Sequence, residues 1–250
     1  MRLDLYLVEN NYFESRNKAR QAIEEGAVLV NGKPILKSSF DITDETITVL
    51  ETSNPYVSRG GLKLKAAIES FRLDFNGKTI VDIGASTGGF TDCALSFGAS
   101  KVYAIDTGTN QLAEKLLYDP RVINLEQTNI LDIPYFPEEI HYFVMDVSFV
   151  SIKHLLPGIS KFINEDNALV CLIKPQFEVG KVHMKNGIVK DRTTHIRVLE
   201  GIVEELKLYN LFIDKLIPSP ILGGSGNKEF LALIKTKSNS KINIVEVCNK

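Results

Sequence analysis

The chain has 250 residues, 44% hydrophobic and 24% charged, a composition typical of an ordinary globular protein. Its net charge of −2 does not by itself indicate a nucleic-acid-binding protein, and no apolar run of about 18 residues could span a membrane. The start of the chain does not resemble a secretory signal, and the three cysteines and four histidines lack disulfide or metal-ligand spacing. We therefore expect a cytoplasmic protein without a bound metal.

The first sixty residues predict two helices followed by a small sheet. Apolar residues at helical spacing open the chain, and a second helix should run from a cap at Ser15 to a stop at Gly26. The apolar stretch Val28–Val30 leads into Asn31-Gly32, a strong hairpin signal because type I′ turns need positive φ at both central residues. A further strand over Thr46–Leu50 should complete this α+β module.

Basic residues are concentrated in this module, although charge alone favours a solvated helix face over a binding surface. The string Ser15-Arg16-x-Lys18-Ala19-Arg20, continuing to Asn31-Gly32, resembles the S4 RNA-binding domain. In that family, the corresponding helix and hairpin present cations to RNA phosphates, contacts that carry little sequence information. The expected RNA-binding residues are Arg16, Lys18, Arg20, Lys33 and Arg59.

The sequence Asn54-Pro55-Tyr56 is typical of a linker, because proline disfavours helix at the preceding residue. We therefore predict three segments: an S4-like domain over residues 1–53, a linker over 54–58, and a larger domain over 59–250. In the larger domain, apolar runs alternate with helical stretches. Strands are expected at Thr79–Ile83, Val102–Ile105, Tyr142–Val147, Ala168–Ile173, Phe212–Ile217 and Phe230–Ile234, and helices at Thr91–Phe97, Gln111–Tyr118 and Thr193–Tyr209.

This alternation predicts an α/β, Rossmann-like, doubly wound sheet that is mostly parallel. The last two expected strands leave little room for a helix between them, so the last strand should be antiparallel. The run from Asp82 to Phe90 follows the first strand and precedes a helix, and its glycines allow a sharp turn close to a ligand. Asp106 ends the next strand, where an acid can accept hydrogen bonds from both ribose hydroxyls of an adenosine. NAD-binding folds use the same device, so these features leave the cofactor ambiguous.

Four charged residues should converge at the carboxyl edge of the sheet, where open α/β folds bind ligands. Asp146 and Lys174 each follow an apolar strand, and Glu229 precedes the antiparallel one. Lys63 lies before the first strand of the domain, in Ser58-Arg59-Gly60-Gly61-Leu62-Lys63. Any one of these charges is more often a solvated strand end, but the convergence of two lysines and two acids indicates a site.

The whole chain resembles the TlyA family, often labelled hemolysins, whose catalytic domain is similar to the FtsJ-type RNA ribose methyltransferases. The matching strings are Tyr56–Gly61, Asp82–Phe90, Asp146–Phe149, Lys174–Glu178 and Gly226–Leu231. The resemblance implies a class I methyltransferase that uses S-adenosyl-L-methionine to methylate a ribose 2′-hydroxyl, with cytidine expected, in ribosomal RNA or ribosomal subunits. The chain departs from the family pattern at 106–112, on the adenosine side, and at 181–189, on the substrate side.

The family's Lys-Asp-Lys-Glu tetrad falls on Lys63, Asp146, Lys174 and Glu229. Our hypothesis is that Lys174 accepts the hydroxyl proton or orients the hydroxyl. The positive charge of Lys63 would favour the neutral form of the Lys174 amine, and Lys63 would also contact substrate, while Asp146 and Glu229 would fix the positions of both ammonium groups. The resemblance implies a cofactor site formed by Asp82, Gly84, Ala85, Ser86, Gly88, Gly89, Phe90, Asp106 and Asp146.

Four alternatives remain open at this point. The family label suggests a membrane-acting hemolysin, although the sequence offers no span and no persuasive amphipathic helix. A non-catalytic RNA-binding protein with a degenerate methyltransferase fold is a second alternative, and a nicotinamide dehydrogenase is a third. A pseudouridine synthase would use an Arg-Leu-Asp motif, and Arg72-Leu73-Asp74 matches it, but in the context of a different fold.

Overall fold

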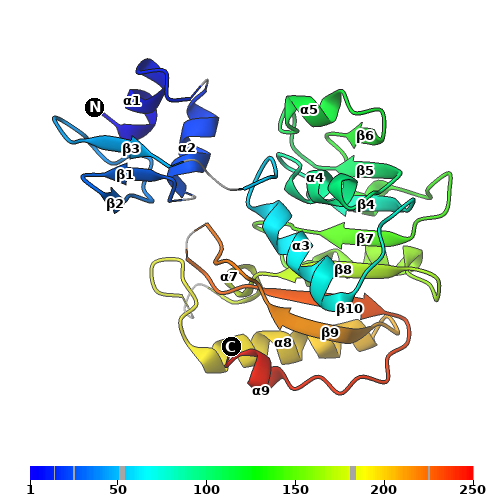
Figure 1. Cartoon of the computed structure of the whole chain (residues 1–250). Helices are drawn as coiled ribbons and strands as arrows, with labels where there is room; N and C mark the ends of the chain where they lie inside the picture. Colours follow the sequence, from blue (N-terminus) through cyan, green and yellow to red (C-terminus); the bar gives the residue numbers. More distant parts are fainter. Residues whose placement is uncertain (14, 25, 51–53, 181–183, 225, 250) are drawn as a thin grey trace. The chain divides into compact units, whose positions relative to one another are not determined.

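The computed structural model of the chain contains two compact units, Met1–Ser58 and Arg59–Lys250, each with its own hydrophobic core (Figure 1). The structure describes residues 1–13, 15–24, 26–50, 54–180, 184–224 and 226–249.

The amino-terminal unit packs two helices, α1 (Leu3–Glu9) and α2 (Arg16–Glu24), with a three-stranded antiparallel sheet. The sheet has the order β2-β1-β3, formed by Lys33–Pro34, Val28–Val30 and Ile47–Val49. As predicted, the Ser15 hydroxyl accepts a hydrogen bond from the Lys18 backbone N–H at the start of α2. Asn31 and Gly32 both have positive φ, of 50° and 75°, as the expected hairpin turn requires.

The second unit is built on a seven-stranded sheet with the order β6-β5-β4-β7-β8-β10-β9 (Figure 1). β10 runs antiparallel to its neighbours β8 and β9, whereas the neighbouring strands from β6 to β8 in the sheet pair in parallel, which confirms the predicted architecture. The strands are β4 Thr79–Ile83, β5 Lys101–Ile105, β6 Val122–Leu125, β7 Tyr142–Met145, β8 Ala168–Ile173, β9 Phe212–Pro218 and β10 Phe230–Lys235.

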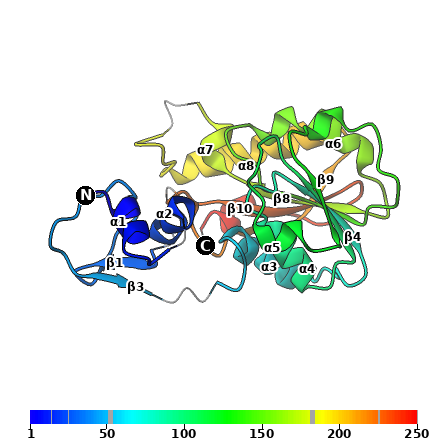
Figure 2. The same ribbon diagram turned by 90° about the horizontal axis from the view of Figure 1, so that it is seen from above.

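Helices cover both faces of this sheet, as in a doubly wound fold. Figure 2 shows α3, α4 and α5 on one side and α6 and α8 on the other, with the buried strands between them. The helices are α3 Gly60–Phe71, α4 Gly89–Ser96, α5 Glu114–Leu117, α6 Leu156–Ile159, α7 Pro175–Glu178, α8 Arg192–Lys207 and α9 Ile244–Val247. Single 3₁₀ turns lie at Ile130–Asp132, Ile152–His154 and Ser160–Phe162.

Several predicted elements were wrong in extent. The helix expected over Gln111–Tyr118 contains only the four residues of α5, and the strand expected to reach Val147 ends at Met145. The second strand of the predicted hairpin, β2, contains only Lys33 and Pro34. Lys63, expected simply to precede the first strand, lies on the twelve-residue helix α3.

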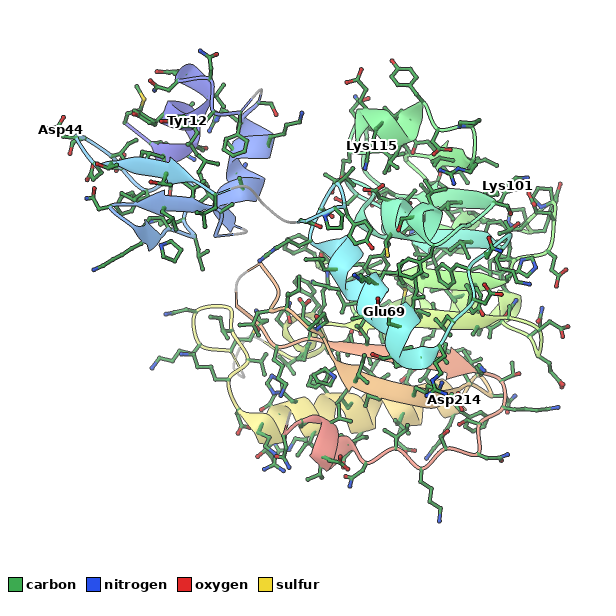
Figure 3. All side chains as sticks on the ribbon, viewed as in Figure 1. Tyr12, Asp44, Glu69, Lys101, Lys115 and Asp214 are labelled. Atoms are coloured by element: carbon green, nitrogen blue, oxygen red, sulfur yellow. The ribbon has the colours of Figure 1, made fainter. Side chains whose placement is uncertain are left out.

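The carboxyl ends of the parallel strands form one edge of the large sheet, and their amino ends form the other. Lys101, at the amino end of β5, and Lys115, on α5, lie at opposite edges in Figure 3. Phe230 pairs with Ile173 across the β10–β8 ladder, so Glu229 and Lys174 both lie at the carboxyl edge of β8. The single antiparallel strand therefore brings a residue from its start to the edge where the parallel strands end.

Candidate active site

The turn after β4 has no room for a side chain at Gly84 or Gly88. Gly84 has φ of +81°, and a Cβ there would lie 2.9 Å from the backbone oxygen of Asp146. The amides of Gly84 and Ala85 both donate to the carbonyl of Ile105, at 2.9 and 3.0 Å, which ties the turn to the end of β5. Gly88 has φ of +91° and would place a side chain against Leu112 and Leu116. The backbone therefore comes close to the edge of the sheet.

Asp82 is fully buried at the base of this turn. The Thr91 hydroxyl donates to its Oδ2 at 2.7 Å, and its Oδ1 has no hydrogen-bond partner among the described residues. Burial, reinforced by the negative charge of Asp146, raises the pKa of Asp82 to about 7. The site therefore holds a carboxyl group that a nearby cation would convert to its ionised form.

Asp106, at the end of β5, accepts hydrogen bonds from the turn after β4 and from the loop after β5. Its Oδ2 accepts from the amide of Ser86 and its Oδ1 from that of Gly108, both at 2.8 Å. Ser86 itself has a positive φ of 48°. The predicted ribose-binding acid is thus half-buried beside the glycine turn, and each of its oxygens retains a lone pair for a further donor.

Lys63 and Glu229 form a buried ion pair. Lys63 Nζ lies 2.6 Å from Glu229 Oε2, and the two residues are 8% and 2% exposed. Gln176, on α7, donates from Nε2 to the other oxygen, Oε1, at 3.0 Å. Gly223 leaves the space that this carboxylate fills, because a Cβ there would collide with Glu229.

Lys174 and Asp146 form a second pair, with Nζ 2.6 Å from Oδ1. This contact has the distance of an ion pair without hydrogen-bond geometry, since Oδ1 makes no hydrogen bond among the described residues. Lys174 Nζ also donates to the Ser148 hydroxyl at 2.7 Å. The four predicted charges therefore lie at one edge of the sheet as two pairs. The segment of α7 links the pairs, because Lys174 belongs to one and Gln176, two residues later, contacts Glu229 of the other.

An exposed aromatic ring borders the second pair. Phe149 is 92% exposed although its neighbour Ser148 contacts the buried Lys174. Its backbone has φ of +65°, a region that costs a non-glycine residue about 1–3 kcal/mol. The Phe149 and Phe177 rings are 5.2 Å apart. Packing within the fold does not account for an exposed apolar ring on a strained backbone.

The predicted RNA-binding residues of the amino-terminal unit are accessible. Arg16 donates a hydrogen bond to the carboxylate of the buried Asp4 at 3.0 Å, and the Arg16 side chain remains 51% exposed. Arg2 donates to the same carboxylate. Burial opposes ionisation of Asp4, but the bonds from Arg2 and Arg16 outweigh it and lower its pKa. Lys18, Arg20 and Lys33 are exposed. Arg59 instead belongs to the second unit. Its guanidinium nitrogen Nη2 lies near Gly224, 3.8 Å from where a Cβ on that glycine would stand.

The site is thus a glycine turn lined by acids next to two lysine–carboxylate pairs, one buried and one partly buried. The sequence matches the FtsJ-like methyltransferase model over residues 56–236 and the S4 domain model over residues 1–47. The chain belongs to the FtsJ-like methyltransferase family. It therefore joins a methyltransferase domain to an S4 domain, as the resemblance implied.

Relatives of this methyltransferase extend over nearly the whole chain. It is 42% identical to Hemolysin A of Brachyspira hyodysenteriae, with 93% of this chain and 98% of that protein covered. It is 36% identical to the 16S/23S rRNA (cytidine-2′-O)-methyltransferase TlyA of Mycobacterium tuberculosis, covering 95% and 91% of the two chains. A solved structure of a hemolysin-named protein of Streptococcus thermophilus is 39% identical, with a TM-score of 0.79 and coverage of 100% and 94%.

The hemolysin names and the methyltransferase names therefore fall on relatives of one family. None of the helices in the described part of this methyltransferase has the length and apolarity that crossing a bilayer requires. Nor do the described residues bring three or more His, Cys, Asp or Glu side chains together as metal ligands.

Sequence reasoning missed two polar partners of the tetrad, Ser148 and Gln176. Both lie within strings that carried the family resemblance, so their position in the motif was the available signal. Their contacts depend on how the segments after β7 and β8 fold back, which spacing alone does not give. In the departing stretch 181–189, residues 181–183 lie outside the described part.

Proposed function

We propose that this chain transfers a methyl group from S-adenosylmethionine to a ribose 2′-hydroxyl, that of a cytidine, in ribosomal RNA. The observation that carries the proposal is the two lysine–carboxylate pairs, one buried and one partly buried, beside the acid-lined glycine turn. Relatives named as rRNA (cytidine-2′-O)-methyltransferases support the choice of substrate. A ribosomal substrate also supports a cytoplasmic site of action.

The residues around the turn fit S-adenosylmethionine better than a dinucleotide. Asp82, Asp106 and Asp146 surround the turn with carboxylates, which suit the ammonium, sulfonium and hydroxyl groups of S-adenosylmethionine and repel a pyrophosphate. When bound, this cofactor supplies a methyl group already activated by positive sulfur. The residues that would hold it are Asp82, Gly84, Ala85, Ser86, Gly88, Gly89, Phe90, Asp106 and Asp146.

Lys174 is the group we propose to handle the hydroxyl proton. A lysine accepts a proton only when its amine is neutral, so one ammonium proton must first pass to a neighbouring acceptor. Asp146 Oδ1 lies 2.6 Å from Nζ and would take this proton once the ammonium turns a hydrogen toward it, while the Ser148 hydroxyl holds the amine in position. The neutral amine would then accept the 2′-hydroxyl proton as the hydroxyl oxygen takes the methyl group, whose bond to sulfur would break to leave a neutral thioether.

The second pair has an orienting role in this proposal. Glu229 is held by Lys63 on one oxygen and by Gln176 on the other, so its carboxylate has a fixed orientation. Gln176 and Lys174 are on one short segment, so this anchoring also limits movement of the catalytic amine. Lys63 contributes positive charge near the hydroxyl and the flanking phosphate.

Two further parts would hold RNA. The exposed Phe149 offers a ring on which the base of the target nucleotide can stack. The S4 domain, proposed over residues 1–53 with a linker over 54–58, would bind phosphates through Arg16, Lys18, Arg20 and Lys33, with Arg59 contributing from the catalytic domain over 59–250. The Arg2–Asp4–Arg16 cluster supports this role because Asp4 presents two guanidinium groups together.

Transfer of tritiated methyl from S-adenosylmethionine to ribosomes, separated subunits and naked ribosomal RNA tests the proposal. We expect label in RNA from at least one of these, recovered after nuclease digestion as a 2′-O-methylated cytidine. Label on a base, or no label on any of them with cofactor binding demonstrated, would contradict it.

A further inference from the structure

A cavity of about 260 Å³ lies where the end of α7 meets the first turns of α8. Its lining includes Lys153, from the 3₁₀ turn after β7, and Arg197, from α8. Neither the tetrad nor the glycine turn lines it. The cavity is therefore separate from the cofactor and proton-transfer groups of the methyltransferase.

The two cations that line the cavity are not neutralised by a carboxylate. Within the part of the chain that the structure describes, the ammonium group of Lys153 and the guanidinium group of Arg197 form no ion pair or hydrogen bond. Glu178 also lines the cavity, but its oxygens accept from the Ser151 hydroxyl at 2.5 Å and from the Ile152 amide at 2.9 Å. The lining thus carries excess positive charge, with its one described acid already bonded elsewhere.

A continuous series of contacts connects the cavity to the catalytic lysine. The segments 148–153 and 174–180 run side by side, the first leading to Lys153 and the second to the cavity wall at Gly180. The contacts join Lys174 to Ser148, Phe149 to Phe177, and Ser151 to Glu178. A nucleic-acid strand that presents its ribose to Lys174 therefore has an aromatic ring and then a cationic cavity along its path.

We propose that Lys153 and Arg197 bind one phosphodiester group of the substrate RNA, next to the methylated nucleotide. Arginine presents a planar fork of donors that matches phosphate oxygens, and lysine adds a mobile point charge. Successive nucleotides repeat a phosphate along the strand, so an anion near the target ribose and base is unavoidable. This inference rests on the proposed function, since it takes RNA to be the substrate. An acidic protein segment is the competing occupant, and it would leave RNA binding independent of both side chains.

The test compares the double variant Lys153→Gln/Arg197→Gln with Lys207→Gln. Lys207 lies near the other end of α8, is 52% exposed and pairs with Glu204, so its loss removes a charge from the same helix away from the cavity. Binding of purified ribosomal RNA is measured over a range of salt concentrations for each protein. Methyl transfer and S-adenosylmethionine binding are measured alongside.

For the double variant, we expect weaker RNA binding, a raised KM for RNA and an unchanged Kd for S-adenosylmethionine. The slope of log K against log salt should fall in magnitude by about 1, as one phosphate contact is lost. Lys207→Gln should match the wild type in every measurement, and Lys153→Arg/Arg197→Lys should restore most of the RNA affinity.

An unchanged RNA affinity and salt slope in the double variant would overturn the proposal. Loss of S-adenosylmethionine binding would also overturn it, because it would show a structural effect rather than a phosphate contact. Binding can be measured even if the wild type transfers no methyl group to RNA. Failure of the methyltransferase proposal can therefore be distinguished from failure of this one.

Discussion

At the scale of single residues, the fully buried Asp82 has an environment that departs clearly from water. Its pKa of about 7 in the fold lies above the ordinary value of 3.8, chiefly because the side chain is fully buried. The folded chain therefore binds this proton more tightly than the unfolded chain does. Its contribution to stability is complete below about pH 4 and is lost as the pH rises through about 7.

Asp82→Asn should remove this pH dependence. The asparagine oxygen can still accept from Thr91, and no charge has to be buried at high pH. Melting temperatures at about pH 5 and about pH 8 should therefore differ less for the variant than for the wild type. Equal pH dependence in the two proteins would show that Asp82 does not titrate in this range.

Phe149 combines a strained backbone with an exposed ring that we propose to stack on the target base. Phe149→Gly should relieve about 1 kcal/mol or more of strain at φ of +65°, and little buried surface is lost with an exposed ring. We expect an unchanged or higher melting temperature together with a KM for RNA raised by the loss of about 1–3 kcal/mol of base stacking. Full activity in a stable Phe149→Gly protein would remove the ring from the substrate site.

At the scale of elements, the β4–α4 turn depends on the absence of a side chain at Gly84. Gly84→Ala would incur the positive-φ cost of about 1–2 kcal/mol and would also press a methyl group against the backbone of Asp146. Gly77→Ala is a matched control, because Gly77 has a similar φ of +69° with nothing within 4 Å.

Both substitutions should lower the melting temperature, but only Gly84→Ala should weaken S-adenosylmethionine binding, measured by calorimetry. Equal cofactor affinity in the two variants would indicate that the close approach of Gly84 to Asp146 is unimportant for the site.

The elements also show what the sequence could predict. Buried strands such as Ala168–Ile173 were recognised because both faces are covered and every residue is apolar. β6 was missed because it is short, partly exposed and at the edge of the sheet. α3 was not predicted, although Leu64, Ala67, Ile68 and Phe71 follow helical spacing, because the two glycines at its start are poor helix formers.

The positions of the tetrad followed from topology, but its pairing did not. Strand ends and the antiparallel β10 place Asp146, Lys174 and Glu229 at one edge, which sequence reasoning anticipated. Which lysine contacts which acid depends on side-chain directions from α3 and on the fold of the loops. Spacing carries no information about those directions.

At the scale of the whole molecule, the division into two units predicts separable tasks. A chain that begins at Arg59 keeps the large core, the glycine turn and both ion pairs. We expect it to fold and to bind S-adenosylmethionine with unchanged Kd. Its KM for RNA should rise by about tenfold or more, since the tethered S4 domain no longer raises the local concentration of substrate. An unchanged KM would argue against RNA binding by residues 1–58.

The central claim is that Lys174 handles the proton of a ribose hydroxyl during methyl transfer. The most direct measurement is the single-turnover rate of methyl transfer to ribosomal RNA by Lys174→Ala, with Lys161→Ala as an exposed-lysine control at the amino edge of the sheet. The account predicts that transfer is lost in Lys174→Ala while the Kd for S-adenosylmethionine is nearly unchanged, and that Lys161→Ala resembles the wild type. Wild-type transfer by Lys174→Ala, or loss of cofactor binding in a folded Lys174→Ala protein, would contradict it.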